Sequence, residues 1–292
     1  MKYRKSVGEI AFDSFNIVII LFLITITLYP FWYITVASLS SPTVVAQQRG
    51  IMLLIKGLNF EAYNAVFKNP NIWTGYQNTI FYVVVGTIVN LFMTTLGAYG
   101  LSRKNVYGKA GIMKIIVFTM FFSGGLIPTF LIMKSMGLVD SRWSMIFPSA
   151  ISTYNMIIMR TAFQSVPDSL EESARIDGAN DFVIMWRIIV PLSIPVMAVI
   201  SLFYAVGHWN SFFNALVYLR TRTLFPLQLI LREILITNIT DSMMTNVAND
   251  REPIGETIKY ATVIVSTLPI LCLYPFLQRY FVKGIMIGSL KE

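Results

Sequence analysis

A polar stretch, RTAFQSVPDSLEESARIDGAN at residues 160–180, separates two long apolar runs and carries the signals of a helix that begins and ends on its own. Pro167 suits the first turn of a helix, where its missing N–H costs nothing. Asp168 and Glu171 then lie near the positive end of the helix dipole. Gly178 follows about three turns later, at the place of a left-handed C-terminal cap. The stretch therefore predicts a short, self-capped helix outside the apolar runs.

A second helical segment is expected to start at Asn180 or Asp181. Its apolar residues recur at i, i+3, i+4 and i+7, which places them on one helix face: Phe182, Met185, Trp186 and Ile189. Pro191 and Pro195 then lead into the next apolar run. We call residues 161–190 the elbow. A helix–glycine–helix elbow suits an element that passes motion from a soluble partner to the apolar helices, and an ordinary interfacial loop is the alternative.

The composition indicates that lipid surrounds most of the chain. Of 292 residues, 55% are hydrophobic and only 13% are charged, and the mean hydropathy is +0.64. Soluble domains carry about 25% charged residues, so this chain is too poor in charge for a fully water-exposed surface. The net charge of +8 fits the excess of Lys and Arg in the cytoplasmic loops of membrane proteins, and we expect no nucleic acid partner.

Windows without charge locate the membrane-spanning helices, because a helix needs about 20 residues to cross the hydrocarbon core and a central charge is costly. Six windows of 17 or more residues lack Asp, Glu, Lys and Arg. Turn residues trim the longest of them, and the expected spans are 14–37, 75–99, 112–133, 143–160, 191–215 and 259–280. The predicted fold class is an all-α integral membrane protein with six transmembrane helices in one domain, 1–292.

An even number of spans places both termini on one side. Lys2, Arg4 and Lys5 precede the first span, and a slight excess of basic residues in the inner segments favours cytoplasmic termini. The first span resembles a signal peptide, but its apolar stretch is longer than a signal core, so an uncleaved helix is preferred. The outer segments are then 38–74, 134–142 and 216–258. The mixed charges of the last one indicate either a solvated face or a docking surface.

The elbow resembles the EAA motif of ABC-importer permeases. Glu172-Ser173-Ala174, then Asp177-Gly178-Ala179, then Ile188 to Pro191 follow that pattern, with Ser173 in place of the usual Ala. The preceding VPDSLE at 166–171 is similar to the carbohydrate branch, which includes the second permease of the maltose system. The resemblance implies the type I importer fold and a cytoplasmic coupling helix that docks in a cleft of the ATPase subunit.

Three further stretches resemble the same branch, so the likeness covers nearly the whole chain. FFSGGLIPT at 121–129 looks like the subgroup for oligosaccharides and polysaccharides, of which the alginate type is one. WNSFF at 209–213 is similar to a Trp-Asn-x-Phe hallmark, and FVKGIMIGS at 281–289 to a tail that reaches into the ATPase dimer. Ser123-Gly124-Gly125 lies in an apolar run, where small residues favour close helix packing.

The resemblance implies the partners as well. This chain would form the translocation path for an oligosaccharide or polysaccharide fragment together with a second permease, as a heterodimer in the bacterial inner membrane. An external solute-binding protein would deliver the sugar. Two ATP-binding subunits would hold ATP and Mg, since this chain contains no Gly-x4-Gly-Lys-Ser/Thr and no cofactor is expected in it.

Candidate site residues fall into three groups. The resemblance implies contact with the ATPase for Glu171, Glu172, Ala174, Asp177 and Gly178, and for Gly284, Gly288 and Ser289 of the tail. Amides and aromatic faces bind sugars, which suggests a path lined by Tyr154, Asn155, His208, Trp209, Asn210 and Phe213. His208 has an open alternative as a structural hydrogen-bond partner, because a polar group in lipid faces the bundle interior or a water-filled path.

The remaining residues argue against catalysis. His208 is the only histidine and Cys272 the only cysteine, so paired-His zinc sites, Cys clusters and intrachain disulfides are excluded, and neither a catalytic nor a metal site is expected. Cys272 lies in an apolar run, and we expect it to be a packing residue. A secondary transporter of a small polar solute is the alternative function, although such carriers generally need ionisable groups at membrane depth. An intramembrane enzyme would need a catalytic pair that the spans do not supply.

Overall fold

A computed structural model describes residues 6–48, 50–236 and 254–289, with side chains as far as Cys272. Every regular element in these ranges is a helix. The chain forms two compact units, one of Met1–Asn69 with Glu233–Thr267 and the other of Pro70–Arg232 with Leu268–Glu292. The predicted all-α class is confirmed.

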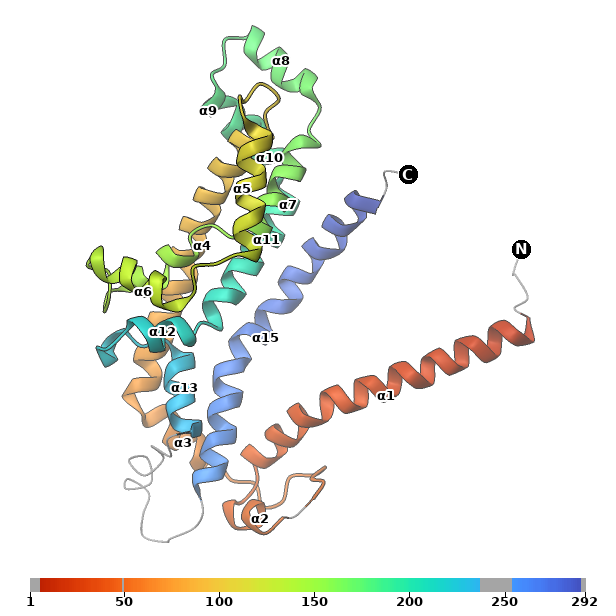
Figure 1. The fold of residues 1–292 in the computed structure, drawn as a ribbon. Coiled ribbons are helices and arrows are strands. Elements are labelled where there is room, and N and C mark those ends of the chain that lie inside the picture. The colour runs from red at the N-terminus through yellow and green to blue at the C-terminus, as the bar shows by residue number, and fades with distance from the viewer. Residues whose placement is uncertain (1–5, 49, 237–253, 290–292) are drawn as a thin grey trace. The chain divides into compact units, whose positions relative to one another are not determined.

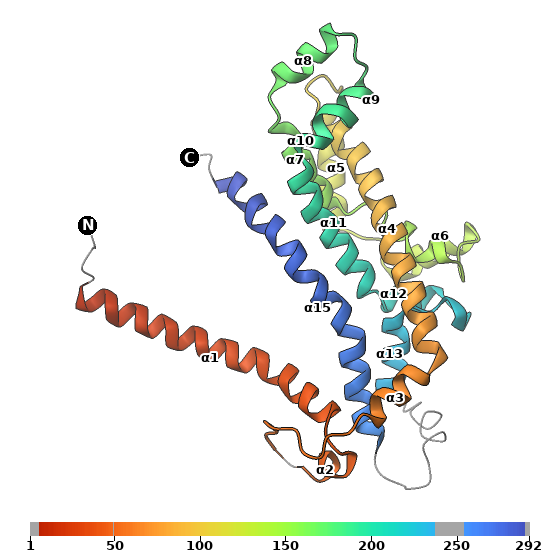
Figure 2. The ribbon, with the colours of Figure 1, turned by 180° about the vertical axis from the view of Figure 1, so that it is seen from behind.

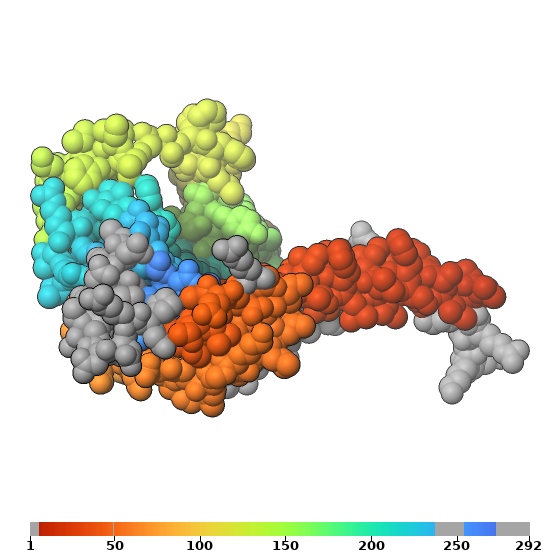
Figure 3. Space-filling view, turned by 90° about the horizontal axis from the view of Figure 1, so that it is seen from below, coloured from red at the N-terminus to blue at the C-terminus, as the bar shows by residue number. Residues whose placement is uncertain are grey.

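The first unit is dominated by helix α1, Val7–Ser38. A capping box starts this helix: the Ser6 amide donates to Glu9 Oε2 (2.7 Å) and the Glu9 amide donates to Ser6 Oγ (3.2 Å). Its apolar side chains are exposed all round for most of its length. Figure 3 shows α1 projecting from the orange residues that follow it in the same unit. A helix that is apolar on all sides requires lipid or another protein around it.

Only the C-terminal end of α1 packs in a hydrophobic core. There Val36 and Ala37 pack with Val45 of α2 (Pro42–Gln47) and with Met52. Tyr33 meets the edge of Tyr260 with ring centroids 5.9 Å apart. Tyr260 lies near the start of α15, Ile254–Ser289, and the short helix α3, Glu61–Lys68, completes the unit.

The second unit is built on α4, Pro70–Ser102, which packs along α7 (Thr153–Gln164) and α11 (Ile194–Trp209) in both ribbon views (Figures 1 and 2). The apolar core of this bundle gathers side chains from all three helices and from the chain before α11. Its largest fully buried members are Met159, Phe163, Ile184, Met185, Ile189 and Ile200.

The expected span 112–133 is not one helix. α5 (Lys109–Phe121) and α6 (Leu126–Ser135) are bent by 112° at the residues between them. Two consecutive glycines, Gly124 and Gly125, disfavour a helix there, and Pro128 suits the first turn of a new one. Both glycines are exposed within this chain, so the close helix packing expected around them stays a prediction. They lie at the break between α5 and α6.

The expected span 143–160 is also interrupted. Two short 3-10 turns, Arg142–Met145 and Phe147–Ser149, precede α7, whose first residue is Thr153. Ser152 caps α7 by accepting from the Asn155 amide. Pro148 and the cap residue Ser152 are local signals for this break, which the apolar window alone does not reveal.

The elbow continues into α11 through an irregular helix. α9 (Asp181–Ile184) passes into a π-helix (Met185–Ile189) and α10 (Val190–Leu192), and α11 follows at an angle of 84°. Pro191 has no N–H to donate to the turn before it, and it is the second residue of α10. The expected apolar face is half right: Met185 and Ile189 are buried, while Phe182 and Trp186 are exposed.

The segment after α11 lies against the first half of α4. α12 (Phe213–Tyr218) and a turn at Arg222–Leu224 lead to α13 (Leu227–Ile236). Asn78 of α4 donates to the Thr223 and Phe225 carbonyls (2.7 and 3.1 Å), and the Tyr82 hydroxyl donates to the Leu224 carbonyl (2.7 Å).

Three helices in the described residues are long and apolar enough to cross a membrane: α1, α4 and the described start of α15, Ile254–Cys272. The count rises to five when each bent pair, α5 with α6 and α9–α10 with α11, is taken as one span. The predicted total of six depends on the region 143–160, whose helix α7 has 12 residues.

Candidate functional site: a coupling helix and a polar pocket

α8, Asp168–Ile176, lies beyond the ends of α4, α5 and α7 at one extremity of the second unit (Figures 1 and 2). Its start differs by one position from the prediction: Pro167 is the N-cap residue (φ −58°, ψ 132°) and the first helical residue is Asp168. Asp168 and Glu171 occupy the first turn as expected, where carboxylates stabilise a helix.

The end of α8 confirms the predicted left-handed cap. Gly178 has φ +81°. Its amide donates to the Arg175 carbonyl (3.0 Å), and the Ala179 amide donates to the Ala174 carbonyl (2.9 Å), which is the bonding pattern of a Schellman motif. Ala174 and Ala179 both pack against the core of the unit. The Ala of the EAA pattern therefore anchors α8 to the bundle.

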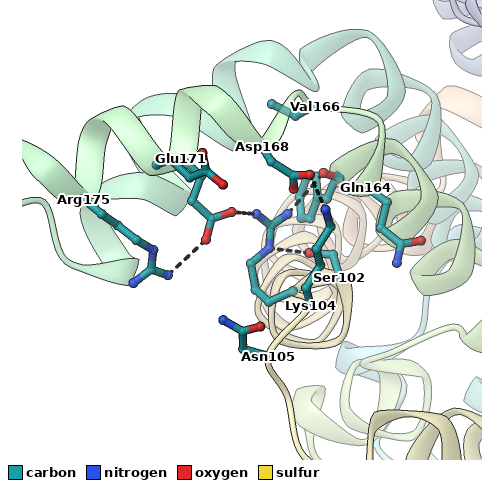
Figure 4. A pocket seen from close by; sticks show the side chains of 11 residues that line it. Ser102, Lys104, Asn105, Gln164, Val166, Asp168, Glu171 and Arg175 are labelled. Atoms are coloured by element: carbon teal, nitrogen blue, oxygen red, sulfur yellow. Dashed lines mark hydrogen bonds and ion pairs between the residues drawn. The ribbon is translucent and has the colours of Figure 1, made fainter.

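Ion pairs join α8 to its neighbours. Glu171 pairs with Arg103, just beyond the C-terminus of α4, and with Arg175 at 3.0 Å. Arg175 also reaches Asp181 at 2.5 Å across the Gly178 turn. Figure 4 shows the Glu171 carboxylate between two guanidinium groups, with Arg175 extending from the same helix. α8 is therefore connected both to α4 and to the start of α9.

A second pair, Lys104 with Asp168, lies at the start of α8 (Figure 4). The hydrogen bond and the charge of Asp168 raise the pKa of Lys104. The hydrogen bond that Arg175 donates to Glu171 and the charge of Asp181 likewise raise the pKa of Arg175. Both cations thus stay charged at neutral pH. These groups border a pocket of about 500 Å³ between the α4–α5 loop, the end of α7 and α8.

The opposite face of α8 is open. Glu172 and Asp177 are exposed, and Ile176 is 86% exposed although it is a large apolar residue. Leu170 is exposed on the same helix. An apolar side chain ringed by carboxylates on a projecting helix is typical of a protein-docking surface.

A second site is a polar pocket of about 290 Å³ in the helix bundle. Its walls come from the interrupted segment before α7 and from α11 and the residues after it. Hydroxyl, amide and aromatic groups face it: Ser149, Ser152, Asn155, Phe203, Tyr204, His208, Ser211 and Asn214. Among these described lining residues none carries a full charge at neutral pH.

His208 also has the structural role that the sequence left open. Its Nε2 lies 2.6 Å from Asn90 Oδ1, and the Asn90 amide donates to the Ser149 and Ala150 carbonyls (2.5 and 2.9 Å). The Asn90 oxygen is thus the acceptor, so His208 Nε2 donates. This chain of bonds holds the interrupted segment against α4 and α11.

A parallel chain runs through Tyr204. Its hydroxyl lies 2.7 Å from Thr94 Oγ1 and accepts from the Ser152 amide at 3.0 Å. Together the two chains satisfy backbone groups that the break before α7 exposes in a membrane-depth segment. Tyr204 and His208 therefore shape the pocket wall as well as line it.

The structure separates the predicted path residues. Asn155 and His208 line the pocket. Trp209 is only 6% exposed and packs near Tyr76 with ring centroids 6.5 Å apart. Tyr154 and Phe213 are exposed on other surfaces, and Asn210 caps α11. A role in the path stays a prediction for all six residues.

The tail residues Gly284, Gly288 and Ser289 lie in α15, beyond the last described side chain. The predicted outer segment 216–258 is described as far as 236 and again from 254. The predicted contacts of both segments with partner proteins remain predictions.

Sequence reasoning missed several functional positions. Nothing in the local pattern around Arg103 reveals that it pairs with Glu171, whereas the pair of Glu171 with Arg175 follows the i, i+4 spacing of a helix. Asn90 offered a signal, because an amide at membrane depth usually has a structural or functional partner. Ile176 offered another, since it is a large apolar residue in a mostly polar helix.

Comparisons with known proteins agree with this geometry. Residues 10–287 match the family described as binding-protein-dependent transport system inner membrane component. The chain is 41% identical to the polygalacturonan/rhamnogalacturonan transport system permease protein YtcP of Bacillus subtilis, covering 96% of this chain and 98% of the relative. It is 42% identical to protein LplC of the same organism, covering 96% and 95%.

Solved structures give the same result. The chain is 35% identical to a chain of a bacterial ABC transporter involved in the import of the acidic polysaccharide alginate, with a TM-score of 0.90 over 96% of this chain and 100% of that chain. A second alginate transporter structure, in complex with an alginate pentasaccharide-bound periplasmic protein, matches at a TM-score of 0.55 and 15% identity, which shows the fold alone.

These matches extend over almost the full length of the chain and confirm the type I permease fold implied by the elbow. Members of the family are membrane-spanning transport subunits and not enzymes. The chain belongs to the family of inner membrane components of binding-protein-dependent transport systems, the permease subunits of ABC importers.

Proposed function

We propose that this permease imports fragments of acidic polysaccharides. The observation that carries the proposal is the 41% identity, over 96% of the chain, to a permease named for polygalacturonan and rhamnogalacturonan. The likeness to a chain of an importer for the acidic polysaccharide alginate supports the same substrate class. Both relatives point to oligosaccharides that contain uronic acid.

The partners follow from the family arrangement. A second, different permease completes the translocation path, two ATP-binding subunits hold ATP and Mg, and an external solute-binding protein delivers the sugar. With both termini in the cytoplasm, α8 and the elbow 161–190 face the ATP-binding subunits. The exposed Glu172, Ile176 and Asp177 form the docking face of α8.

Transport then proceeds by alternating access. ATP binding closes the ATP-binding subunits and moves α8, and the bundle changes from inward-facing to outward-facing. A shift from 1:99 to 99:1 between two states requires about 5.5 kcal/mol of differential binding. α8 must therefore keep a fixed position on its own bundle, and the Schellman cap and ion pairs supply that rigidity.

The polar pocket is the part of the sugar path that this chain contributes. Asn155, Ser211 and Asn214 offer amide and hydroxyl groups to sugar hydroxyls, and Phe203 offers an aromatic face to the C–H side of a pyranose ring. Its volume of about 290 Å³ suits one sugar residue at a time.

The docking role is tested with Ile176→Asp in the full importer. We expect co-purification of the ATP-binding subunits to fall about tenfold or more, because a charge replaces an apolar contact at an interface. Leu58→Asp, a matched change at another exposed apolar residue outside α8, is expected to leave this association unchanged. Unchanged co-purification in Ile176→Asp would contradict the docking role.

The substrate class is tested by uptake into proteoliposomes that contain the importer and its binding protein. We expect oligogalacturonides to be accumulated with ATP, and neutral gluco-oligosaccharides of equal length to be accumulated much less. Equal uptake of both would contradict the acidic substrate class while leaving the importer function intact.

A further inference from the structure

Arg103 joins three helices at the base of α8. Its Nη2 donates to the Phe163 carbonyl at the end of α7 (3.1 Å), and its Nη1 pairs with Glu171 of α8. Its Nε lies 3.0 Å from Ser102 Oγ, and its guanidinium lies over the Tyr99 ring at 4.9 Å, both in α4. One side chain therefore connects α4, α7 and α8.

Glu171 and Glu172 are adjacent in α8, but their carboxylates are in different environments. The side chain of Glu171 is 17% exposed and that of Arg103 is 16% exposed. Glu172 points into solvent. Glu171 thus faces its own bundle, between Arg103 and Arg175 (Figure 4). A partner that docks on the exposed face of α8 meets Glu172 before Glu171.

Because Arg103 and Glu171 are partly buried, the loss of their ion pair has a larger energetic effect than the loss of a surface ion pair. Exposed pairs are screened by water and salt and contribute little, while shielded pairs with several hydrogen bonds are felt when one partner is removed. The Lys104–Asp168 pair is the exposed counterpart, with side chains 77% and 54% exposed. It joins the same two regions of the chain and provides a natural control.

We propose that Arg103 and Glu171 are a positioning pair that makes α8 move with α4 and α7. This inference rests on the proposed docking role of α8 and deepens it. Glu172 and Ile176 hold the ATP-binding subunit, and Arg103 with Glu171 passes the movement of α8 to two helices of the bundle that contains the polar pocket. Loss of the pair leaves α8 docked on the ATP-binding subunit but lets α8 move without α4 and α7.

The experiment uses the full importer in proteoliposomes with Glu171→Gln, Arg103→Gln and the double variant. Three quantities are measured: co-purification of the ATP-binding subunits, ATP hydrolysis stimulated by the loaded binding protein, and sugar taken up per ATP hydrolysed. We expect unchanged co-purification and an approximately tenfold fall in uptake per ATP in each single variant, the equivalent of ~1.4 kcal/mol.

The double variant is expected to be no worse than either single variant, because both changes remove one interaction. Lys104→Gln is expected to keep the wild-type ratio of uptake to hydrolysis. A purely structural role would lower uptake and hydrolysis together and leave their ratio unchanged.

Three results would overturn the proposal: a wild-type ratio in both single variants, additive losses in the double variant, or loss of the ATP-binding subunits in Glu171→Gln. The last result would make Glu171 a docking contact. If Ile176→Asp keeps its ATP-binding subunits, the docking role of α8 fails instead, which is a separate outcome.

Discussion

At residue scale, the packing of His208 depends on the absence of a side chain at Gly86. A Cβ built at Gly86 would lie 2.4 Å from His208 Nε2 and 2.6 Å from its Cε1. The ring cannot turn away freely, because Nε2 is bonded to Asn90. Gly86 therefore lets α4 and α11 approach closely, as small residues do between membrane helices.

We expect Gly86→Ala to destabilise the protein by ~1–3 kcal/mol through overpacking. Thermal unfolding of the purified importer in detergent, followed by gel filtration, measures the effect. Gly100→Ala is the matched control in the same helix, since nothing lies within 4 Å of a Cβ there. Equal melting temperatures for the two variants would contradict the close approach.

Asp140 is a second residue whose backbone and side chain act together. It has φ +60°, the one positive value among the described non-glycine residues. Its carboxylate accepts from the Arg220 and Thr221 amides (both 2.8 Å) and from Thr221 Oγ1 (2.6 Å). The Thr221 hydroxyl and amide lower the pKa of Asp140 below its usual 3.8.

The lowered pKa predicts the sign of a pH effect. The stabilisation is complete above the usual Asp pKa and is lost as the pH falls through the lowered value. We expect Asp140→Ala to lower the melting temperature at neutral pH by roughly 2–4 °C. The difference from wild type should shrink as the pH falls below the usual Asp pKa of 3.8 and through the lowered value. Asp140→Asn is expected to be milder, because Asn tolerates positive φ. A pH-independent difference would contradict this account.

At the scale of elements, α8 depends on how it ends. Gly178 has φ +81° and open space around the position that a Cβ would take, so the cost of a substitution there is backbone strain and not a clash with neighbours. That strain is ~1–2 kcal/mol for an ordinary side chain and larger for a β-branched one. The direction of the chain into α9 is set at this residue.

We expect Gly178→Val to leave membrane insertion intact, because no span is changed, but to weaken association with the ATP-binding subunits and to abolish most uptake. Gly178→Asn, which tolerates the same backbone conformation, is expected to stay near wild type. Co-purification and uptake are measured side by side. Wild-type values of both in Gly178→Val would show that the angle of α8 is not needed for coupling.

At the scale of the whole molecule, the exposed apolar surface of α1 requires lipid or another protein around it, and the length of the C-terminal helix fits the predicted tail contact. α1 is apolar on every side and is covered by its own unit only at its C-terminal end. α15 continues as a helix through Ser289, well past the predicted span 259–280.

Deletion of residues 284–292 tests the tail. All spans remain, so we expect normal membrane levels of the subunit, while the predicted contact of the tail with the ATPase dimer leads us to expect that stimulated ATP hydrolysis falls at least twofold. Alanine replacement of Lys291 and Glu292 alone serves as the control for a change of terminal charge. An unchanged hydrolysis rate after the deletion would rule out the tail contact.

Much of the fold was predictable because lipid imposes strict local rules. Charge-free windows located α1, α4, α11 and α15, and the proline and glycine of the elbow located both ends of α8 to within one residue. The interruptions within 112–133 and 143–160 were not predicted. A window count averages over the proline, glycine and cap residues that break a helix, and some of the freed backbone groups find their partners in other helices.

The sequence by itself determined that lipid surrounds this protein, that α8 is self-capped and which family the chain belongs to. Each of these depends on composition or on residues adjacent in the chain. Tertiary structure alone decided which carboxylate of α8 faces inward, that His208 bonds to Asn90, and that Trp209 is buried. Each of these contacts joins residues that are far apart in the chain. Glu171 and Arg103 are 68 positions apart, His208 and Asn90 are 118 apart, and Trp209 and Tyr76 are 133 apart. Contacts at such separations depend on how helices pack, which no local pattern encodes.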